Sequence, residues 1–253
     1  MAFDEQAVVD EFWAARARGE YFPAAWFDRL SLDEAYRIQS GMIARRIAAG
    51  ERQIGWKVGL TAPAIQQQFG FHEPVFGCIL DSKPSGHVFA RDELIKPGFE
   101  SELCLRMAQK LSGQVDMATV RRAIDVVYPS LEIIETRGDF TAQIALAMAD
   151  NAQQKAVILG DPVPLGQLAL ETVECTVRIN GDVAATGHGD AVLGNPLNSV
   201  IWLARKLAEF GRSIQPGEII MSGSFTRQFP IGPGDRVKVS FVGIGEVGTT
   251  MAD

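Results

Sequence analysis

Three glutamates in two short apolar segments could together hold a hard metal ion. Glu100 and Glu102 lie in residues 99–105, and Glu132 lies in residues 129–135. In an extended strand, residues two apart face the same side, so Glu100 and Glu102 would project together. Three carboxylates with open positions suit Mg²⁺ or Mn²⁺ better than a thiolate-binding metal. The alternative interpretation is a solvent-exposed strand face, on which alternating glutamates are common.

A lysine between two glycines is a second candidate for chemistry. Residues 55–61 read Gly-Trp-Lys-Val-Gly-Leu-Thr, with Lys57 near the end of an expected strand. Glycines let the backbone approach a ligand closely, and the ammonium group of Lys57 can bind an anion. The alternative is an ordinary surface lysine on a strand.

The sequence lacks motifs for several other chemistries. The three histidines have neither metal-ligand nor triad spacing, and each is interpreted as a surface or loop residue: His72, His87 and His188. There is no Gly-x-Ser-x-Gly nucleophile elbow. The glycine-rich segment 243–245 lies between expected strands and precedes no helix, so it does not match a phosphate-binding loop. A serine hydrolase and a nucleotide-binding protein are therefore disfavoured.

The composition is that of an ordinary globular protein with an acidic balance. The chain has 253 residues and a formal net charge of −7, the wrong sign for binding a phosphate backbone. Its three cysteines are spread along the chain in apolar contexts, which indicates buried thiols in a reducing compartment. The N-terminus is acidic where a signal peptide is basic, and no apolar run approaches the ~18 residues of a membrane helix. We therefore expect a soluble, cytoplasmic protein that binds neither nucleic acid nor membrane.

Two amphipathic helices are expected in the first part of the chain. Apolar residues at helical spacing and a glycine stop predict a helix over residues 3–18. Ser31 and Glu34 form a capping box for a second helix. The other elements expected here are a strand over 54–60 and a short helix over 62–69. We interpret residues 1–72 as an N-terminal helical cap.

Short extended segments separated by Gly and Pro dominate residues 73–253. The expected strands are 75–80, 86–89, 99–107, a segment around Glu132, 173–179, 183–186, 218–221, 236–242 and 246–251. The expected helices are one capped by Asp116 that continues through Val127, one over 139–152, and one that begins at Asn195-Pro196. Asn180-Gly181 suits a type I′ hairpin turn. Strands outside a regular βαβ alternation predict an α+β fold, in which this β-rich catalytic domain and the cap form one compact unit.

Several motifs in this order and spacing resemble one enzyme family. Together they resemble the 2-keto-4-pentenoate hydratase and 4-oxalocrotonate decarboxylase group of the fumarylacetoacetate hydrolase superfamily. The likeness covers nearly the whole chain and rests on the segments 55–61, 73–77, 100–102, 131–134, 149–152, 193–198 and 222–224. The resemblance implies a mostly β roll of mixed sheets with an N-terminal helical part, assembled as a homo-oligomer.

The resemblance also implies roles for particular residues. Glu100, Glu102 and Glu132 match the family's ligands for Mg²⁺ or Mn²⁺, and Lys57 matches its active-site lysine. Residues implied to contact substrate are Lys57, Leu80, Gln153 and Ser224. In such enzymes the carboxylate and 2-oxygen of a small 2-oxo or 2-hydroxydienoic acid chelate the ion. The ion then stabilises an enolate of this substrate.

Three positions depart from the family's pattern. Val75 stands where hydratases commonly have the aspartate that handles water, whereas decarboxylases commonly have an apolar residue there. Glu73 is a candidate to replace that acid, and the alternative is a carboxylate beside a turn. Gln153 replaces a serine that would face the substrate, and Asn195 replaces a histidine.

The sequence therefore leaves several functions open. The first prediction is a metal-dependent lyase of aromatic catabolism that hydrates a 2-hydroxydienoate through a metal-bound enolate. The close alternative is a decarboxylase of a 2-oxo-enedioate, and the third is an acylpyruvate hydrolase that cleaves a C–C bond. A binding protein that keeps the ion but has lost the chemistry is the alternative from another class, against which the intact glutamates and Lys57 argue.

Overall fold

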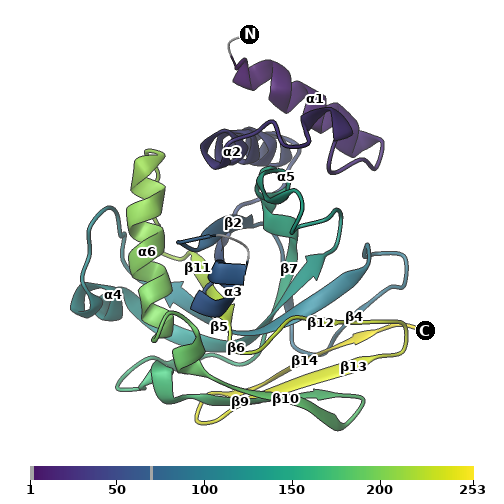
Figure 1. The fold of residues 1–253 in the computed structure, drawn as a ribbon. Helices are drawn as coiled ribbons and strands as arrows, with labels where there is room; N and C mark the ends of the chain where they lie inside the picture. The colour runs from purple at the N-terminus through teal and green to yellow at the C-terminus, as the bar shows by residue number, and fades with distance from the viewer. Residues whose placement is uncertain (1–2, 69–70) are drawn as a thin grey trace.

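Two mixed β-sheets form the core of the computed structural model, which describes residues 3–68 and 71–253. Figure 1 shows the larger sheet in the middle of the molecule, with helices above and beside it and the smaller sheet below. Within the described residues, no helix combines the length and the apolar character of a membrane span. The predicted α+β class with curled, mixed sheets is confirmed.

The larger sheet carries the three glutamates and the lysine. Its strands follow the order β2-β1-β11-β5-β6-β7-β3, with β1 parallel to β11 and β3 parallel to β7. The strands are β1 (Gly55–Gly59), β2 (Val75–Ile79), β3 (Ser82–Pro84), β5 (Pro97–Met107), β6 (Ile124–Glu135), β7 (Gln154–Leu159) and β11 (Ile219–Ser224), with β8 (Val163–Pro164) beside β6 and β12 (Phe229–Pro230) beside β5. Because β1 pairs with β11, the N-terminal part contributes to this sheet, and a domain boundary at residue 72 stays a prediction.

The smaller sheet packs against the larger one. Its order is β10-β9-β13-β14-β4, and residues of β14 contact β6 and β7. The strands are β4 (His87–Phe89), β9 (Glu174–Ile179), β10 (Asp182–His188), β13 (Arg236–Phe241) and β14 (Gly245–Met251). The predicted hairpin between β9 and β10 is confirmed, since Asn180 and Gly181 have φ of 55° and 94°. A type I′ turn requires positive φ at both positions.

Helices cover the top and one side of the larger sheet in Figure 1. At the top, α1 (Glu5–Ala17) contacts α2 (Leu32–Ala48), and α2 contacts α5 (Ile144–Ala149). At the side, α4 (Met117–Ala123) contacts α6 (Pro196–Glu209), which lies against β11. The remaining helical segments are α3 (Pro63–Gln68) and the 3₁₀ turns η1 (Ala24–Trp26), η2 (Asn151–Gln153), η3 (Leu170–Thr172) and η4 (Gly189–Ala191). Residue 69, where α3 was expected to end, lies outside the described residues.

Local capping fixes the ends of the helices that the sequence predicts. The capping box of α2 is confirmed: Ser31 Oγ accepts a hydrogen bond from Glu34 N, and Glu34 Oε2 accepts one from Ser31 N. Asn195 caps α6, since its Oδ1 accepts a hydrogen bond from Leu197 N at 2.9 Å. A side-chain cap of this kind typically contributes ~1 kcal/mol. These helices therefore begin where short polar residues precede an apolar stripe.

The helix predicted after Asp116 is too long. Asp116 does cap α4, but the helix ends at Ala123. Residues 124–127, Ile-Asp-Val-Val, instead begin β6, where Val127 pairs with Leu105 of β5. β-Branched side chains lose rotamer freedom in a helix and pack well in a sheet, so pairing with β5 outweighs the helical spacing.

The helix predicted over residues 139–152 is also wrong at both ends. Only α5 is helical, and the chain leaves it through three consecutive non-glycine residues with left-handed backbone, Asn151, Ala152 and Gln153. Each such residue typically costs about 1–2 kcal/mol. Tertiary contacts must hold this turn, because local preferences oppose it.

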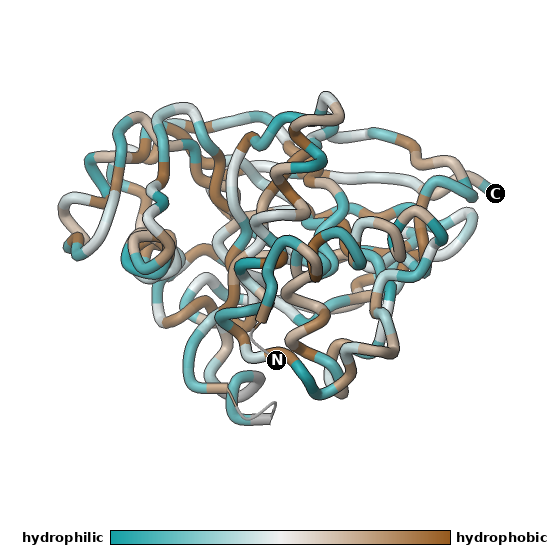
Figure 2. Tube along the Cα trace, turned by 90° about the horizontal axis from the view of Figure 1, so that it is seen from above, coloured by the Kyte–Doolittle hydropathy of each residue, from teal (hydrophilic) through white to brown (hydrophobic). Residues whose placement is uncertain are grey.

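The hydrophobic core lies between the two sheets and under the helices. On the long β5–β6 pair, Phe99, Leu103, Leu131 and Ile133 are completely buried. Full burial of each such side chain typically contributes roughly 1.5–3 kcal/mol. Figure 2 shows hydrophobic and hydrophilic segments alternating along much of the chain trace. The rigid strand pair that results supports the acidic residues between these apolar ones.

Candidate metal centre and substrate cavity

Pairing of β5 with β6 brings the three glutamates together. Glu100 lies directly opposite Glu132 in the antiparallel register, and Glu102 lies two residues further along β5. Side chains opposite each other on neighbouring strands have Cβ atoms ~5 Å apart. One carboxylate oxygen from each glutamate lies within 4.8 Å of the others. The arrangement gives three oxygen donors around one point.

Two of the three carboxylates are fully buried and Glu100 is half-buried on the cavity wall, so the interpretation as a solvent-exposed strand face is wrong for this site. Glu102 and Glu132 have no exposed surface. Glu102 Oε2 accepts a hydrogen bond from Gly223 N at 2.8 Å. Among the described residues, Glu102 Oε1 and Glu132 Oε2 accept no hydrogen bond, and the polar contact of Glu132 Oε1 is its ion pair with Lys57. Buried carboxylates in this state need either a compensating cation or a proton.

The pKa values of the cluster reflect this shortage of positive charge. Burial and repulsion from Glu132 raise the pKa of Glu100 to about 7. Burial and repulsion from both neighbours raise the pKa of Glu102 well above its ordinary value. Burial raises the pKa of Glu132 as well, although Lys57 opposes that shift. The fold holds three acids at a place where, without a cation, they would bind protons.

Lys57 supplies part of the missing charge. It projects from β1, and its Nζ lies 3.3 Å from Glu132 Oε1, within ion-pair distance. Burial opposes its charge, but attraction to Glu132, Glu100 and Glu102 outweighs burial and raises the pKa of Lys57. One ammonium cannot neutralise three carboxylates. Three hard oxygen donors with two negative charges left over fit a divalent ion such as Mg²⁺ or Mn²⁺.

A glycine at an irregular position of β11 holds Glu102 in place. The register between β11 and β5 shifts between Met221 and Ser224, and Gly223 has φ of +115°. A Cβ atom on Gly223 would lie 2.4 Å from Thr61 Oγ1. Only glycine therefore fits here, and it lets the backbone N–H point at Glu102 Oε2.

A cavity of about 810 Å³ opens beside the cluster. Predicted site residues that line it are Lys57, Glu100, Gln153 and Ser224, and Val75 lines it too. The volume is in the range of small-molecule sites. The structure therefore brings together the predicted metal ligands and most of the residues predicted to contact substrate.

Two predicted site residues lie elsewhere. Glu73 forms an ion pair with Lys206 of α6 at 2.9 Å and accepts a hydrogen bond from Trp202 Nε1. Leu80 is a buried core residue. Neither lines the cavity, so a catalytic role for Glu73 and a substrate contact for Leu80 stay predictions to which the geometry adds no support.

The cavity also contains residues that the sequence did not single out. Three of its cations come from outside the motif segments: Lys96, Arg137 and Arg227. Arg137 is buried and pairs with Glu135 and Asp150. Lys96 and Arg227 are exposed, and among the described residues neither forms an ion pair. The only sequence signal for them is their place next to strands that carry site residues.

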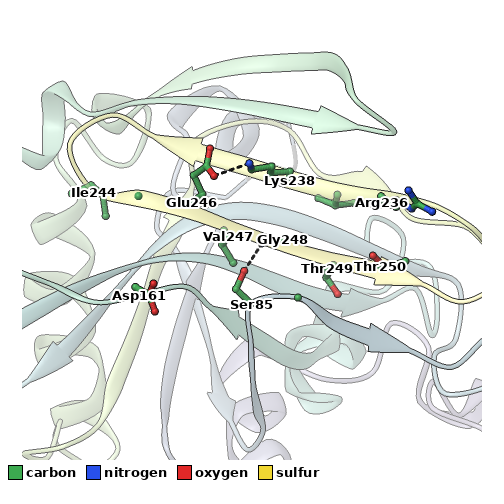
Figure 3. A pocket seen from close by; sticks show the side chains of 13 residues that line it. Ser85, Asp161, Arg236, Lys238, Ile244, Glu246, Val247, Gly248, Thr249 and Thr250 are labelled. Atoms are coloured by element: carbon green, nitrogen blue, oxygen red, sulfur yellow. Dashed lines mark hydrogen bonds and ion pairs between the residues drawn. The ribbon is translucent and has the colours of Figure 1, made fainter.

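A second cavity, of about 680 Å³, lies along β14 of the smaller sheet. Figure 3 shows an ion pair between Lys238 and Glu246 on its wall and a hydrogen bond from Gly248 N to Ser85 Oγ. Its charged side chains are exposed, and Lys238 and Glu246 pair with each other. The only acidic cluster with metal-ligand geometry in the described chain is the one on β5 and β6. Chemistry is therefore expected in the first cavity.

Comparison with known proteins agrees with this geometry. The sequence model of the fumarylacetoacetate (FAA) hydrolase C-terminal family matches residues 82–252. A 2-keto-4-pentenoate hydratase of Paraburkholderia xenovorans (strain LB400) is 36% identical, over 88% of this chain and 85% of the relative. A 4-oxalocrotonate decarboxylase of Pseudomonas putida is 34% identical, over 87% of this chain and 86% of the relative.

Solved structures include a similar protein over the full length. The structure of 4-oxalocrotonate decarboxylase from Pseudomonas putida G7, complexed with magnesium and adipate, superposes with a TM-score of 0.93 at 31% identity. The match covers 99% of both chains. The N-terminal helices and both sheets therefore recur together in that protein.

Replacing one carboxylate should remove divalent binding. We expect Glu102→Gln to weaken Mg²⁺ or Mn²⁺ binding, measured by titration calorimetry, by at least about a hundredfold, since a ligand and its charge are lost. Glu11→Gln makes the same chemical change on an exposed surface of α1 and should leave the affinity unchanged. Equal affinities of wild type and Glu102→Gln would exclude Glu102 as a ligand.

Without a divalent ion, the acidic cluster should destabilise the protein as pH rises. A glutamate with an ordinary pKa of 4.5 and a folded pKa of about 7 binds more protons in the folded chain, so its contribution to the unfolding free energy falls between those values. We expect urea unfolding with EDTA to show that Glu102→Gln gains stability relative to wild type from pH 5 to pH 8. Saturating Mg²⁺ should stabilise wild type at pH 8. A stability difference that does not change with pH would contradict this electrostatic account.

Proposed function

The chain belongs to the fumarylacetoacetate hydrolase family, and on this basis we propose that it is a divalent-metal-dependent lyase acting on a small 2-oxo or 2-hydroxydienoic acid. The observation that carries the proposal is the cluster of Glu100, Glu102 and Glu132 beside Lys57, which meets the cavity through Glu100 and Lys57. Relatives named hydratase and decarboxylase support the lyase class.

The three glutamates would hold Mg²⁺ or Mn²⁺. When bound, the ion supplies positive charge for the negative charge that develops on the 2-oxygen of the substrate. The chain's own contribution is rigidity: Gly223 N–H fixes one oxygen of Glu102, and the β5–β6 register fixes Glu100 opposite Glu132. Preorganised charges of this kind need little rearrangement during the reaction.

Lys57 would bind and orient the substrate. Its raised pKa keeps the ammonium group charged at neutral pH, and it lies in the wall of the cavity beside Glu132. A charged donor in a buried site attracts a carboxylate and holds it by a charge-assisted hydrogen bond. From the same position it can also transfer a proton to the substrate.

Decarboxylation of a 2-oxo-enedioate is the reaction that the cavity supports best. The acidic side chains that line it, within the described chain, are Glu100 and Asp139, and Asp139 Oδ1 accepts a hydrogen bond from Ala142 N. At the position of the missing water-handling acid, Val75 offers only methyl groups. Loss of CO₂ needs no activated water, so it is compatible with this apolar wall.

Charges at the cavity also favour a substrate with two carboxylates. The proposed cation and Lys57 complement one anionic end, and Lys96 and Arg227, which form no ion pair with the described residues, complement a second. In 2-oxohex-3-enedioate, the bond between C5 and C6 breaks, C6 leaves as CO₂, and the electron pair of that bond moves through the conjugated chain to the 2-oxygen. Transfer of one proton to this oxygen, from Lys57 or from water, then gives 2-hydroxypenta-2,4-dienoate.

Hydration of a 2-hydroxydienoate is the second candidate. The hydratase relative at 36% identity supports it as strongly as the decarboxylase relative at 34% supports the first. Hydration requires a group that activates water. Among the residues predicted to contact substrate, Gln153 and Ser224 line this cavity with uncharged polar side chains that can hydrogen-bond to a water molecule. The two reactions share the metal site and differ in the use of the far end of the substrate.

A cytoplasmic homo-oligomer completes the proposal. All three cysteines, Cys78, Cys104 and Cys175, are buried and free, as is common in a reducing compartment. The homo-oligomer rests on the family resemblance.

An assay with two substrates tests the proposed function. We expect Mg²⁺-dependent release of CO₂ from 2-oxohex-3-enedioate, and little loss of ultraviolet absorbance from 2-hydroxypenta-2,4-dienoate. Lys57→Met keeps the side-chain length without the charge and should lower kcat by ~10²–10⁴-fold. Rapid hydration of the dienoate would favour the second candidate, and metal-independent turnover of either substrate would contradict both.

The cations at the cavity mouth should distinguish dicarboxylates from monocarboxylates. We expect Lys96→Met or Arg227→Met to raise KM for 2-oxohex-3-enedioate roughly tenfold, because a charge-assisted contact is lost, and to leave KM for a monocarboxylate unchanged. Lys110→Met removes an exposed lysine outside the cavity and serves as the control. Equal effects on both substrates would show that the two cations do not recognise the second carboxylate.

A further inference from the structure

A strained turn forms part of the cavity wall. Asn151, Ala152 and Gln153 have φ of 59°, 51° and 59°, so three consecutive L-residues adopt left-handed backbone without a glycine. Ala152 and Gln153 line the cavity. Backbone strain of this kind persists only where surrounding contacts hold it, and it concentrates at functional sites.

Asn151 holds the turn to the strand beside Lys57. Its Oδ1 accepts a hydrogen bond from Cys78 N at 2.7 Å, and its Nδ2 donates one to Cys78 O at 2.8 Å. The neighbouring residue of β2, Gly77, passes so close that a Cβ there would lie 3.0 Å from Asn151 O and 3.4 Å from Lys57 Cγ. The turn and the aliphatic part of the Lys57 side chain therefore both pack against Gly77.

Asp150 holds the turn from the other side. Its Oδ2 accepts a hydrogen bond from Arg137 Nε at 2.5 Å, and its backbone oxygen accepts one from Arg137 Nη2 at 3.0 Å. Its Oδ1 pairs with Arg16 of α1 at 3.3 Å. Arg137 in turn pairs with Glu135 at the end of β6. The N-terminal helix is thus connected to the cavity wall through buried charges.

The orientation of the Gln153 amide follows from these contacts. Gln153 Nε2 donates a hydrogen bond to Gly138 O at 3.0 Å. The reversed amide would place Oε1 against Gly138 O, two acceptors facing each other. In the observed orientation Oε1 accepts no hydrogen bond from the described residues, so it can accept one from a ligand in the cavity that Gln153 lines. Phe22 packs where a Cβ of Gly138 would stand, at 2.3 Å, which fixes the segment that carries this carbonyl.

We propose that Asp150 and Asn151 are positioning residues that hold the left-handed turn so that Gln153 Oε1 accepts a hydrogen bond from an O–H group of the ligand in the cavity. This inference rests on the proposed function in that the ligand is a small 2-oxo or 2-hydroxydienoic acid, whose enol form, also the product of decarboxylation, carries the O–H group. Gln153 would then favour ligands that carry a hydrogen-bond donor. Lys96 and Arg227, by contrast, would favour ligands that carry a second carboxylate. Asn151 acts through Gln153 and does not itself touch the ligand.

A double-mutant cycle tests whether Asn151 acts through Gln153. Gln153→Met keeps the length of the side chain but removes the acceptor, and Asn151→Ala removes both hydrogen bonds to Cys78. We expect each to lower kcat/KM about five- to tenfold, and the double variant to lower it no more than about tenfold. Effects that multiply, or no effect of Gln153→Met, would overturn the proposal.

Controls separate positioning from a general loss of stability. Asn180→Ala also removes a left-handed asparagine with two side-chain hydrogen bonds, to Asp235 and Arg236, but in the β9–β10 hairpin away from the cavity. It should lower Tm without changing kcat/KM. If Asn151→Ala does not fold, Asp150→Asn replaces it in the cycle, since it keeps the shape of the side chain and weakens the pairs with Arg16 and Arg137.

A measurement without ligand or turnover separates this inference from the proposed function. In wild type, the Gln153 side-chain amide proton that donates to Gly138 O should be protected from exchange in nuclear magnetic resonance spectra. Asn151→Ala should increase the exchange rate of this proton at least tenfold, and Asn180→Ala should not change it. Unchanged protection in Asn151→Ala would overturn the inference even if the enzyme turns over substrate. Lost protection would support the positioning role even if neither substrate reacts.

Discussion

The electrostatic constraint of three carboxylates facing one point, two of them fully buried and one half-buried, governs the rest of the site. β5 and β6 place Glu100 opposite Glu132 with Glu102 beside them, and Lys57 is the cation of the described chain that pairs with this cluster. Such a cluster opposes folding unless a cation joins it. The apolar residues that alternate with the glutamates on both strands provide the stability that lets the fold keep them there.

Backbone irregularities around this cluster serve the same end. A bulge at Gly223 directs an N–H group at Glu102, and the left-handed turn at Asn151 brings Gln153 to the cavity. Each feature is unfavourable locally and is held by contacts with distant parts of the chain, such as the hydrogen bonds between Asn151 and Cys78. Regular strands thus carry the charge, and irregular segments shape the space in which a ligand would lie.

Local rules predict much of the fold but only part of the site. Period-two alternation placed Glu100 and Glu102 on one face, and capping residues such as Ser31 marked helix starts, because both signals are encoded within a few residues. Glu132 was proposed as a third ligand because it lies in another strand-like apolar segment, and the family resemblance supported it. The pairing that places it opposite Glu100 could not be read from the sequence, since register between strands is a tertiary property. The same limit explains why residues 124–127 were expected in a helix, and why Lys96 and Arg227 were missed.

The central claim is that Glu100, Glu102 and Glu132 hold one divalent ion. Anomalous diffraction from a crystal grown with Mn²⁺ tests it most directly, because it locates the ion without relying on activity. The account predicts a single strong peak about 2.0–2.3 Å from one oxygen of each glutamate, at distances usual for hard cations. A crystal with Mn²⁺ bound elsewhere, or with no peak between the three carboxylates, would contradict it.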